Sequence, residues 1–230
     1  MIWLSEQADP DWFPPLESAL REPPGLLAAG GDLSPARLLA AYERGVFPWY
    51  SAQQPILWWS PDPRMVLFPQ EFKCSRSLRK TLRNGPYTTR TDHAFGAIIR
   101  ACAAPRRGGP DTWLNKDMIA SYEQLHELGY SHSIETYEAG RLAGGLYGIQ
   151  LGRIFFGESM FSTGRDASKV ALARLVEECR ARDIQLIDCQ VASSHLASLG
   201  AREVPRSQFA ALLQRYARRI PVGSWADAAA

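Results

Sequence analysis

A short segment late in the chain, QLIDCQVA, holds an acid and an amide that could act on an amine. Side chains of a β-strand alternate between its two faces, so we expect Asp188 and Gln190 on one face and Cys189 on the other. A carboxylate that accepts a hydrogen bond from the Gln190 amide would turn the amide oxygen toward an incoming amine. Alternatively, Asp188 only caps or pairs locally, and the segment by itself leaves both interpretations open.

A second carboxylate, Glu158, lies in the segment RIFFGESMF. In a regular strand it would share its face with three apolar residues, Ile154, Phe156 and Met160. A carboxylate on an apolar face is costly unless it is paired. The segment alone therefore favours a salt bridge from Glu158 to a nearby arginine, either Arg153 or Arg165.

A basic helix face is predicted in the segment CSRSLRKTLRNG. The spacing of i, i+3, i+4 and i+7 puts four cations on one face, and these are Arg76, Arg79, Lys80 and Arg83. A solvated helix surface is the usual explanation for such a run. Because opposite charges are absent from this segment, a phosphate partner is the hypothesis we favour.

The sequence predicts neither a metal site nor a nucleotide cofactor site. The four histidines, His93, His126, His132 and His195, show no HExxH or other ligand spacing. The four cysteines form no CxxC pair, and neither GxxxxGK[ST] nor a GxGxxG after a strand is present. We therefore expect no cofactor.

The elements that must position these residues begin with an amino-terminal part rich in proline and aromatic residues. Its one clear helix starts at the cap Ser34, has Pro35 in its first turn and ends at Gly45. The segment PDPR, residues 61–64, reads as a rigid turn. We place the domain boundary there, with a small domain over residues 1–62 and a larger one over residues 63–230.

Helical and strand patterns alternate in the larger part of the chain. Helices are expected over 76–83, 93–103 and 116–128, the last of them capped by Asn115. Three strands, SHSIETYE, RLAGGLYGIQ and RIFFGESMF, are separated by turns short enough for an antiparallel meander. A long helix with Asp166 as its cap, the strand QLIDCQVA, a short helix capped by Ser193 or Ser194, and a helix over 207–219 follow, and the tail SWADAAA is expected to fray.

This order predicts a mixed α/β (α+β) fold whose mixed sheet is mostly antiparallel. It is similar to the order of elements in the acyl-CoA N-acyltransferase superfamily. Hydrophobic residues at 46% and charged residues at 22% are typical of globular proteins and exclude disorder, collagen and coiled coil. Nowhere do 18 apolar residues run together, so we expect a cytoplasmic protein, and the net charge of +2 does not by itself indicate nucleic-acid binding.

Several blocks of the chain resemble the leucyl/phenylalanyl-tRNA–protein transferase family. They are GGDLSPARLLAAYERGVFPWY, WWSPDPR, GESMFS and LIDCQ, in this order, within residues 20–210. The resemblance implies a small amino-terminal domain on an acyltransferase-like carboxy-terminal domain. It also implies transfer of Leu or Phe, and less of Met, from aminoacyl-tRNA to the amino-terminal Lys or Arg of acceptor proteins, which marks them for degradation. A monomer is expected.

The resemblance further assigns roles to single residues. It makes Asp188 and Gln190 the catalytic pair, and it puts Glu158 in the active site, where it would bind the cationic acceptor residue. The pocket for the transferred side chain would be lined by Leu146 and Met160, with Phe155 and Leu175 as looser candidates. The terminal adenosine of the tRNA would be held by Trp49 and Trp113. With a tRNA as donor, the phosphate partner of Arg76, Arg79, Lys80 and Arg83 would be its acceptor stem.

Two other functions remain as alternatives. An N-acyltransferase that uses acyl-CoA would have the same topology, but such enzymes cradle the pyrophosphate in a glycine-containing Q/RxxGxG/A turn, whereas this chain has STGRDASK before the long helix. A tRNA-binding module without activity would explain the basic helix, yet it would leave Asp188, Gln190 and Glu158 without a role.

Overall fold

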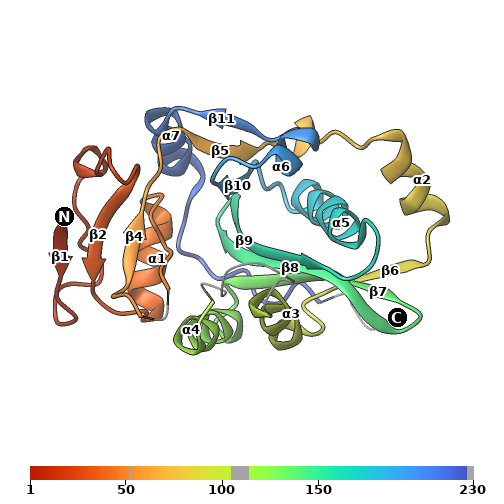
Figure 1. Cartoon of the computed structure of the whole chain (residues 1–230), viewed down its shortest axis with the longest axis horizontal. Coiled ribbons are helices and arrows are strands. Elements are labelled where there is room, and N and C mark those ends of the chain that lie inside the picture. The colour runs from red at the N-terminus through yellow and green to blue at the C-terminus, as the bar shows by residue number, and fades with distance from the viewer. Residues whose placement is uncertain (52, 105–113, 227–230) are drawn as a thin grey trace.

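The chain is built around two β-sheets that lie at different ends of the molecule (Figure 1). The structure, a computed structural model, describes residues 1–51, 53–104 and 114–226. The small sheet takes its strands from residues 2–59, and the large sheet takes its strands from residue 64 onward. The domain boundary between residues 62 and 63 falls in this short connection and stays a proposal.

The small sheet has the strand order β1-β2-β4-β3. Its strands are β1 (Ile2–Leu4), β2 (Leu26–Gly30), β3 (Phe47–Pro48) and β4 (Leu57–Trp59), and a 3₁₀ turn, η1, spans Leu16–Ser18. Helix α1 (Pro35–Glu43) follows β2, and Ser34 caps it as predicted because its hydroxyl accepts the Arg37 N–H at 3.4 Å. The cap and the proline at the first turn start the helix at this point.

The large sheet has seven strands in the order β11-β5-β10-β9-β8-β7-β6. They are β5 (Arg64–Leu67), β6 (Tyr87–Thr91), β7 (Ser131–Glu138), β8 (Arg141–Leu151), β9 (Ile154–Ser162), β10 (Leu186–Gln190) and β11 (Arg202–Val204). The predicted meander of β7, β8 and β9 is confirmed, and every neighbouring pair is antiparallel except β9 with β10. The predicted mixed, mostly antiparallel fold class is therefore confirmed.

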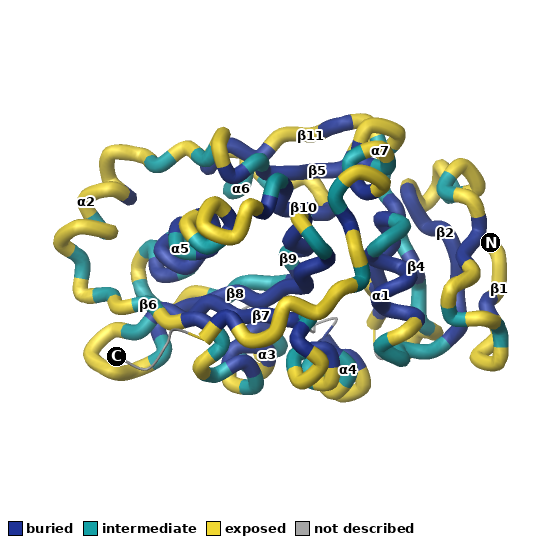
Figure 2. Tube along the Cα trace, turned by 180° about the vertical axis from the view of Figure 1, so that it is seen from behind, coloured by how far each residue is buried: buried dark blue, intermediate teal, exposed yellow. Residues whose placement is uncertain are grey.

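Helices cover both faces of the large sheet. In Figure 1, α5 (Ala167–Ala181) lies on one face, and α3 (Phe95–Ala103) and α4 (Lys116–Glu127) lie on the other. The remaining elements are η2 (Pro69–Glu71), α2 (Arg76–Asn84), α6 (Ser194–Ser198) and α7 (Arg206–Tyr216). Figure 2 shows the buried trace concentrated in the central strands and the inner helix faces, with α2 exposed at one end.

Two of the helix caps predicted for the larger part of the chain are confirmed, and a third is wrong. Asn115 accepts the Met118 N–H at 3.0 Å, and Ser193 accepts the Leu196 N–H at 3.4 Å. Asp166 precedes α5 but has a left-handed backbone with φ of 63°, and its side chain makes no capping bond. Its carboxylate pairs with Lys169 at 2.7 Å instead.

The expectation that the tail frays is also wrong for Trp225. This side chain is 1% exposed and packs in the apolar cluster between the sheet and α5. The Trp225 N–H donates to Asp92 at 2.6 Å, and its indole N–H donates to Gln150 at 3.0 Å. Its terminal position predicted fraying, but one large aromatic residue anchors this segment.

Candidate active site

The site is formed where β9 and β10 separate. These parallel strands pair over three positions only, from Leu186 with Ile154 to Asp188 with Phe156. Immediately beyond, the register of β10 with β5 shifts between Asp188 and Gln190, and the register of β8 with β9 shifts so that Glu158 is the extra residue. Such bulges turn side chains out of the regular alternation.

The backbone of Gln190 confirms that the strand is irregular there. Its φ is 65°, a left-handed value that non-glycine residues rarely adopt. The regular alternation assumed from the sequence for Asp188, Cys189 and Gln190 is therefore wrong. The surrounding contacts must stabilise this conformation against its backbone strain energy.

Asp188 is fully buried in an ion pair with Arg64. The Arg64 Nε donates to Oδ1 at 2.8 Å and Nη2 donates to Oδ2 at 2.6 Å, and both side chains are 0% exposed. The Gln190 backbone N–H donates to the same Oδ1 at 2.9 Å. The predicted bond between the Asp188 carboxylate and the Gln190 side-chain amide is thus wrong, because Asp188 fixes the backbone of Gln190 instead.

Arg64 is itself enclosed by aromatic rings and a carbonyl. Its guanidinium lies 4.8 Å from the ring centroid of Phe47 and 4.7 Å from that of Phe209. Its Nη1 donates to the Gly45 carbonyl at 3.0 Å. The bidentate pair therefore links β5 and β10 to the small sheet and to α7, which gives the ion pair a fixed geometry.

The side-chain amide of Gln190 is held by Glu158. Its Nε2 donates to Glu158 Oε1 at 2.7 Å, and the Tyr122 hydroxyl donates to Glu158 Oε2 at 2.9 Å. The hydroxyls of Tyr42 and Tyr122 are 2.6 Å apart. The salt bridge from Glu158 to Arg153 is wrong, since Arg153 pairs with Asp183 at 2.6 Å. A buried polar chain from the small domain thus reaches Gln190.

Burial raises the pKa of Glu158 from 4.5 to about 7. Hydrogen bonds from the two tyrosines and from Gln190 oppose this rise, and the nearby Asp188 carboxylate adds to it. Burial and the Glu158 charge also raise the pKa of Tyr42 and Tyr122 well above 10, so both stay protonated as donors. Glu158 is therefore poised to change its charge near neutral pH.

Two cavities meet at Glu158 and Gln190. The larger has a volume of about 370 Å³, and its lining includes Leu146, Phe155, Glu158, Met160, Leu172, Leu175, Asp188 and Gln190. The smaller, of about 130 Å³, is lined by Phe47, Pro48, Trp49, Glu158, Gln190 and Val191. The structure thus brings together all the predicted pocket, acid and amide residues, together with Trp49. Trp113 lies outside the described residues.

Trp49 contacts a second tryptophan, Trp59. It is 44% exposed, its ring centroid lies 5.9 Å from that of Trp59, and the Trp59 indole N–H donates to the Trp49 carbonyl at 2.6 Å. An indole fixed in this way at the mouth of a cavity offers a face for a base to stack on.

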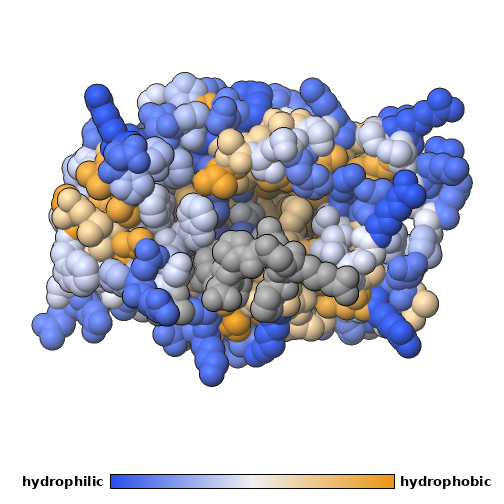
Figure 3. All heavy atoms as spheres, viewed as in Figure 1, coloured by the Kyte–Doolittle hydropathy of each residue, from blue (hydrophilic) through white to orange (hydrophobic). Residues whose placement is uncertain are grey.

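The predicted basic residues stay apart from this site. Arg76, Arg79, Lys80 and Arg83 line one shallow hollow on α2, at the end of the molecule away from the small sheet. Figure 3 shows that hydrophilic side chains cover this end. The face is solvent-exposed and free to meet a large polyanion.

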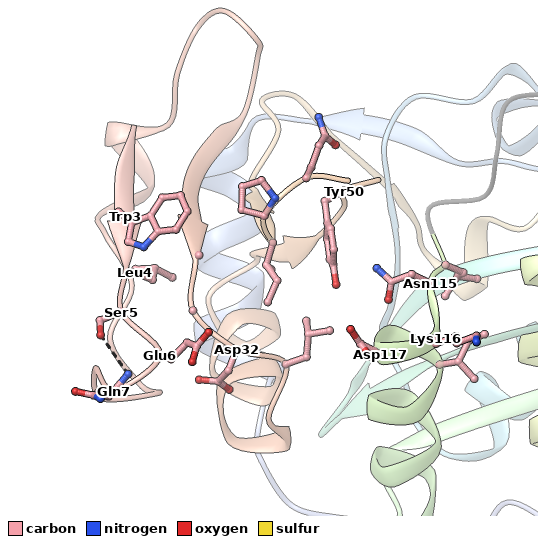
Figure 4. Close-up of a pocket in the computed structure, with 18 residues that line it drawn as sticks. Trp3, Leu4, Ser5, Glu6, Gln7, Asp32, Tyr50, Asn115, Lys116 and Asp117 are labelled. Carbon is pink, nitrogen blue, oxygen red and sulfur yellow. Dashed lines mark hydrogen bonds between the residues drawn. The ribbon is translucent and has the colours of Figure 1, made fainter. Parts of the chain in front are cut away.

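Another cavity lies elsewhere, between the small sheet and α4 (Figure 4). It has a volume of about 1520 Å³, and Tyr50 faces Asn115 and Asp117 across it. Its walls carry three carboxylates, on Glu6, Asp32 and Asp117. Asp32 pairs with Arg37 at 2.9 Å, and Lys116 also lines the cavity, so these negative charges are partly balanced.

Sequence reasoning missed three residues of the site, Arg64, Tyr42 and Tyr122. Arg64 ends the block WWSPDPR, which was a signal that could have found it. The tyrosines gave no such signal, because on an amphipathic helix they read as core residues. In the part of the chain that the structure describes, no group of three acidic, histidine or cysteine side chains could hold a metal ion, and no helix has the length and apolar character needed to cross a bilayer.

Comparison with known proteins decides the family. The family model "Leucyl/phenylalanyl-tRNA protein transferase" matches residues 66–214, and the model of its N-terminal domain matches residues 31–62. The chain belongs to the leucyl/phenylalanyl-tRNA protein transferase family. The resemblance drawn from the sequence is therefore confirmed, and the protein is a transferase.

Curated relatives in this family match nearly the whole chain. The leucyl/phenylalanyl-tRNA–protein transferase of Nitrosospira multiformis is 57% identical over 212 residues, which cover 92% of this chain and 90% of the relative. That of Stutzerimonas stutzeri is 53% identical over 225 residues, which cover 98% and 99%.

Solved structures are similar in fold only. A GCN5-related N-acetyltransferase-like protein from Streptococcus suis has a TM-score of 0.39 at 13% identity and covers 71% of this chain and 61% of its own. A GCN5-related N-acetyltransferase from Kribbella flavida has a TM-score of 0.39 at 10% identity, with coverage of 75% and 61%.

Proposed function

We propose that this transferase moves Leu or Phe, and less of Met, from aminoacyl-tRNA to the amino-terminal Lys or Arg of acceptor proteins. The observation that carries the proposal is the Gln190 amide, which Glu158 holds at the junction of an apolar cavity and a cavity beside an exposed tryptophan. An apolar side chain, a terminal adenosine and an amine can meet there.

The 370 Å³ cavity would hold the side chain of the transferred amino acid. Leu146, Met160, Phe155 and Leu175 present apolar surface to it. An apolar pocket discriminates one methylene by only about 1 to 3 kcal/mol. Flexible Met160 adapts to branched and flat side chains alike. These properties support acceptance of Leu and Phe, and also of Met.

Gln190 would orient the attacking amine. Because its Nε2 donates to Glu158, its carbonyl oxygen lies at the opposite end of the amide and can accept a hydrogen bond from the acceptor α-amine. An α-amine has a pKa of about 7.7 to 8.0, so part of it is neutral in the cell. Its nitrogen attacks the ester carbonyl carbon, the bond to the ribose oxygen breaks, and a proton from the amine ends on the ribose hydroxyl.

Glu158 would attract the cationic side chain of the acceptor. The residue is 9% exposed and borders both cavities. Each oxygen that accepts one hydrogen bond retains a second lone pair for a Lys or Arg group. Asp188 would act at one remove, as a positioning residue that holds the Gln190 backbone through its pair with Arg64. Positioning of this kind can supply much of the acceleration, because an aminoacyl ester is already reactive.

The rest of the tRNA would be bound at two places. Trp49, together with Trp113, would stack on the terminal adenosine, at roughly 1 to 3 kcal/mol for each base. The α2 face of Arg76, Arg79, Lys80 and Arg83 would contact phosphates of the acceptor stem. With charged tRNA as its donor, the protein would work in the cytoplasm, and its products would be marked for degradation. It would be a monomer of two domains divided between residues 62 and 63.

One assay tests this function against acyl transfer from acyl-CoA. Purified protein receives tRNA charged with labelled leucine and a peptide that begins with Arg, and acetyl-CoA is supplied as a competing donor. We expect label on the peptide without ATP, metal or CoA. Acetyl transfer without leucyl transfer would overturn the proposal, and tRNA binding without either transfer would favour a binding module.

A further inference from the structure

We propose that Trp225, near the carboxy-terminal end, sets the depth of the donor cavity by supporting the ring of Phe155. This inference rests on the proposed function, because it assigns the 370 Å³ cavity to the transferred side chain. Trp225 is separated in sequence from every residue that lines this cavity. Its influence on donor choice would act through Phe155, which makes it a positioning residue.

Hydrogen bonds on its backbone and its ring fix Trp225. Its N–H donates to Asp92 Oδ2 at 2.6 Å, and its carbonyl accepts the Thr91 hydroxyl at 2.6 Å. The indole N–H donates to Gln150 Oε1 at 3.0 Å. The residue is 1% exposed, so the indole is a fixed part of the interior rather than a surface contact.

Three neighbours enclose the indole ring. His132 stacks on it with ring centroids 4.5 Å apart and planes at 10°, and the Arg182 guanidinium lies 4.8 Å from its centroid. The Phe155 ring lies 5.5 Å from it at 38°. Arg182 directly follows α5, whose Leu172 and Leu175 form another wall of the cavity. The indole therefore fills the space between the sheet and the end of that helix.

Phe155 is the element that transmits this support to the cavity. It lines the cavity, and its ring covers Gly148 on β8 so closely that a Cβ at that glycine would lie 2.6 Å and 2.7 Å from two ring atoms. The ring is thus limited by β8 on one side and by Trp225 on another. Removal of the indole would let the ring move away from the cavity, and the cavity would deepen.

A deeper cavity favours the longer donor. Phenylalanine extends further from its Cα than leucine. Displacement of the Phe155 ring away from the cavity would give a donor phenylalanine more room and would leave unfilled space around a donor leucine. Pockets of this kind change selectivity by about 10- to 200-fold for each methylene that fits or fails to fit. For a partial displacement of one ring, we expect a change of about threefold or more in donor preference.

The test compares kcat/KM for phenylalanyl-tRNA and for leucyl-tRNA in the parent and in Trp225→Ala. We expect the ratio of the two values to rise about threefold or more in Trp225→Ala and to stay within about twofold of the parent in Trp225→Phe, which keeps an aromatic ring. A loss of folded protein lowers both values by the same factor and cancels in the ratio. If Trp225→Ala does not fold, Trp225→Leu replaces it, with a smaller rise expected.

Trp58→Ala is the matched control. Trp58 is also fully buried, donates its indole N–H to the Gly30 carbonyl at 2.8 Å and packs on Phe13, but it lies in the small sheet. Trp58→Ala should lower kcat/KM for phenylalanyl-tRNA and for leucyl-tRNA by the same factor. An unchanged ratio in Trp225→Ala, or an equal shift in Trp58→Ala, would overturn the inference.

A parent enzyme that transfers neither residue would instead refute the proposed function. In that case the crystal structure of Trp225→Ala decides the physical part of the inference. A Phe155 ring displaced away from the cavity supports it, and an unmoved ring overturns it.

Discussion

The ion pair between Arg64 and Asp188 is the contact whose loss should be felt most strongly in both stability and turnover. Asp188→Ala removes an acceptor from two Arg64 nitrogens at 2.8 and 2.6 Å and from the Gln190 N–H at 2.9 Å. All of these groups are buried, so the guanidinium loses the carboxylate that compensates its charge in the interior.

The expected loss in the free energy of unfolding follows from the buried groups that Asp188→Ala leaves without a partner. A buried guanidinium without its carboxylate costs about 3 to 5 kcal/mol, and the lost hydrogen bond to the Gln190 N–H adds about 1 kcal/mol. Replacing both partners by apolar residues, as in Arg64→Met with Asp188→Leu, leaves no uncompensated charge. The double variant should therefore lose less free energy of unfolding than the sum of the two single variants, by about 2 kcal/mol or more.

Urea unfolding of the parent, of the single variants Arg64→Met and Asp188→Leu, and of the double variant measures this cycle. Single-turnover kinetics with leucyl-tRNA measure its effect on catalysis. Turnover should stay low in the double variant, because Gln190 still lacks the Asp188 oxygen that fixes its backbone. The reasoning is refuted if Asp188→Ala costs less than about 1 kcal/mol, or if the two single effects simply add. Full activity in the apolar double variant would refute the positioning role.

Three further predictions concern other parts of the molecule. The pKa of Glu158 is raised from 4.5 to about 7, so between these pH values the folded protein keeps a proton that the unfolded chain has released. Glu158 therefore lowers the free energy of unfolding progressively above about pH 4.5, and the full loss of roughly 3 kcal/mol is reached above about pH 7. Glu158→Gln should therefore gain stability relative to the parent on going from about pH 4.5 to about pH 8 in urea unfolding, and an equal difference at both values would contradict it. Gly148→Ala would bring a Cβ to 2.1 Å from the Phe156 carbonyl oxygen, so thermal unfolding should show a loss of about 1 to 3 kcal/mol, and an unchanged midpoint would count against this close packing. Arg79→Ala should weaken tRNA binding and reduce the slope of log K against log salt by about 0.7 to 0.9, while turnover at saturating tRNA stays unchanged. The control is Arg215→Ala at an exposed position on α7, which should leave tRNA binding intact.

Much of the larger domain could be predicted because its elements carry local signals. Asn115 and Ser193 start their helices with side-chain caps, and the β7–β8–β9 meander alternates with short turns. The short strands β1, β2, β3, β4, β5, β6 and β11 were not predicted. Strands of two to five residues leave too little periodicity, and their existence depends on partners far away in the chain.

The residues of the site could be predicted better than its connections. Asp188, Gln190 and Glu158 were found from their types and blocks, but the expected bond between the Asp188 and Gln190 side chains was wrong. Two bulges and the left-handed backbone of Gln190 redirect these side chains, and no local pattern announces a bulge. The partner of Asp188, Arg64, lies 124 residues earlier, so only the folded chain reveals the pair.

Trp225 illustrates the opposite error. Its neighbours are small, and their terminal position predicted a frayed tail. The indole is instead held by Asp92 and Gln150, which come from elements far apart in sequence. Whether a terminal segment docks depends on whether the rest of the fold leaves a matching cavity, and that is a property of tertiary packing alone.

The central claim is that the donor places its apolar side chain between β9 and β10 and its reactive carbonyl beside Gln190. A crystal structure with a stable phenylalanyl-adenosine amide analogue tests this most directly. The account predicts the phenyl ring in the 370 Å³ cavity, the carbonyl carbon within reach of an amine bound to Gln190, and the adenine on Trp49. An analogue bound instead in the 1520 Å³ cavity beside Tyr50 and Asp117 would contradict it.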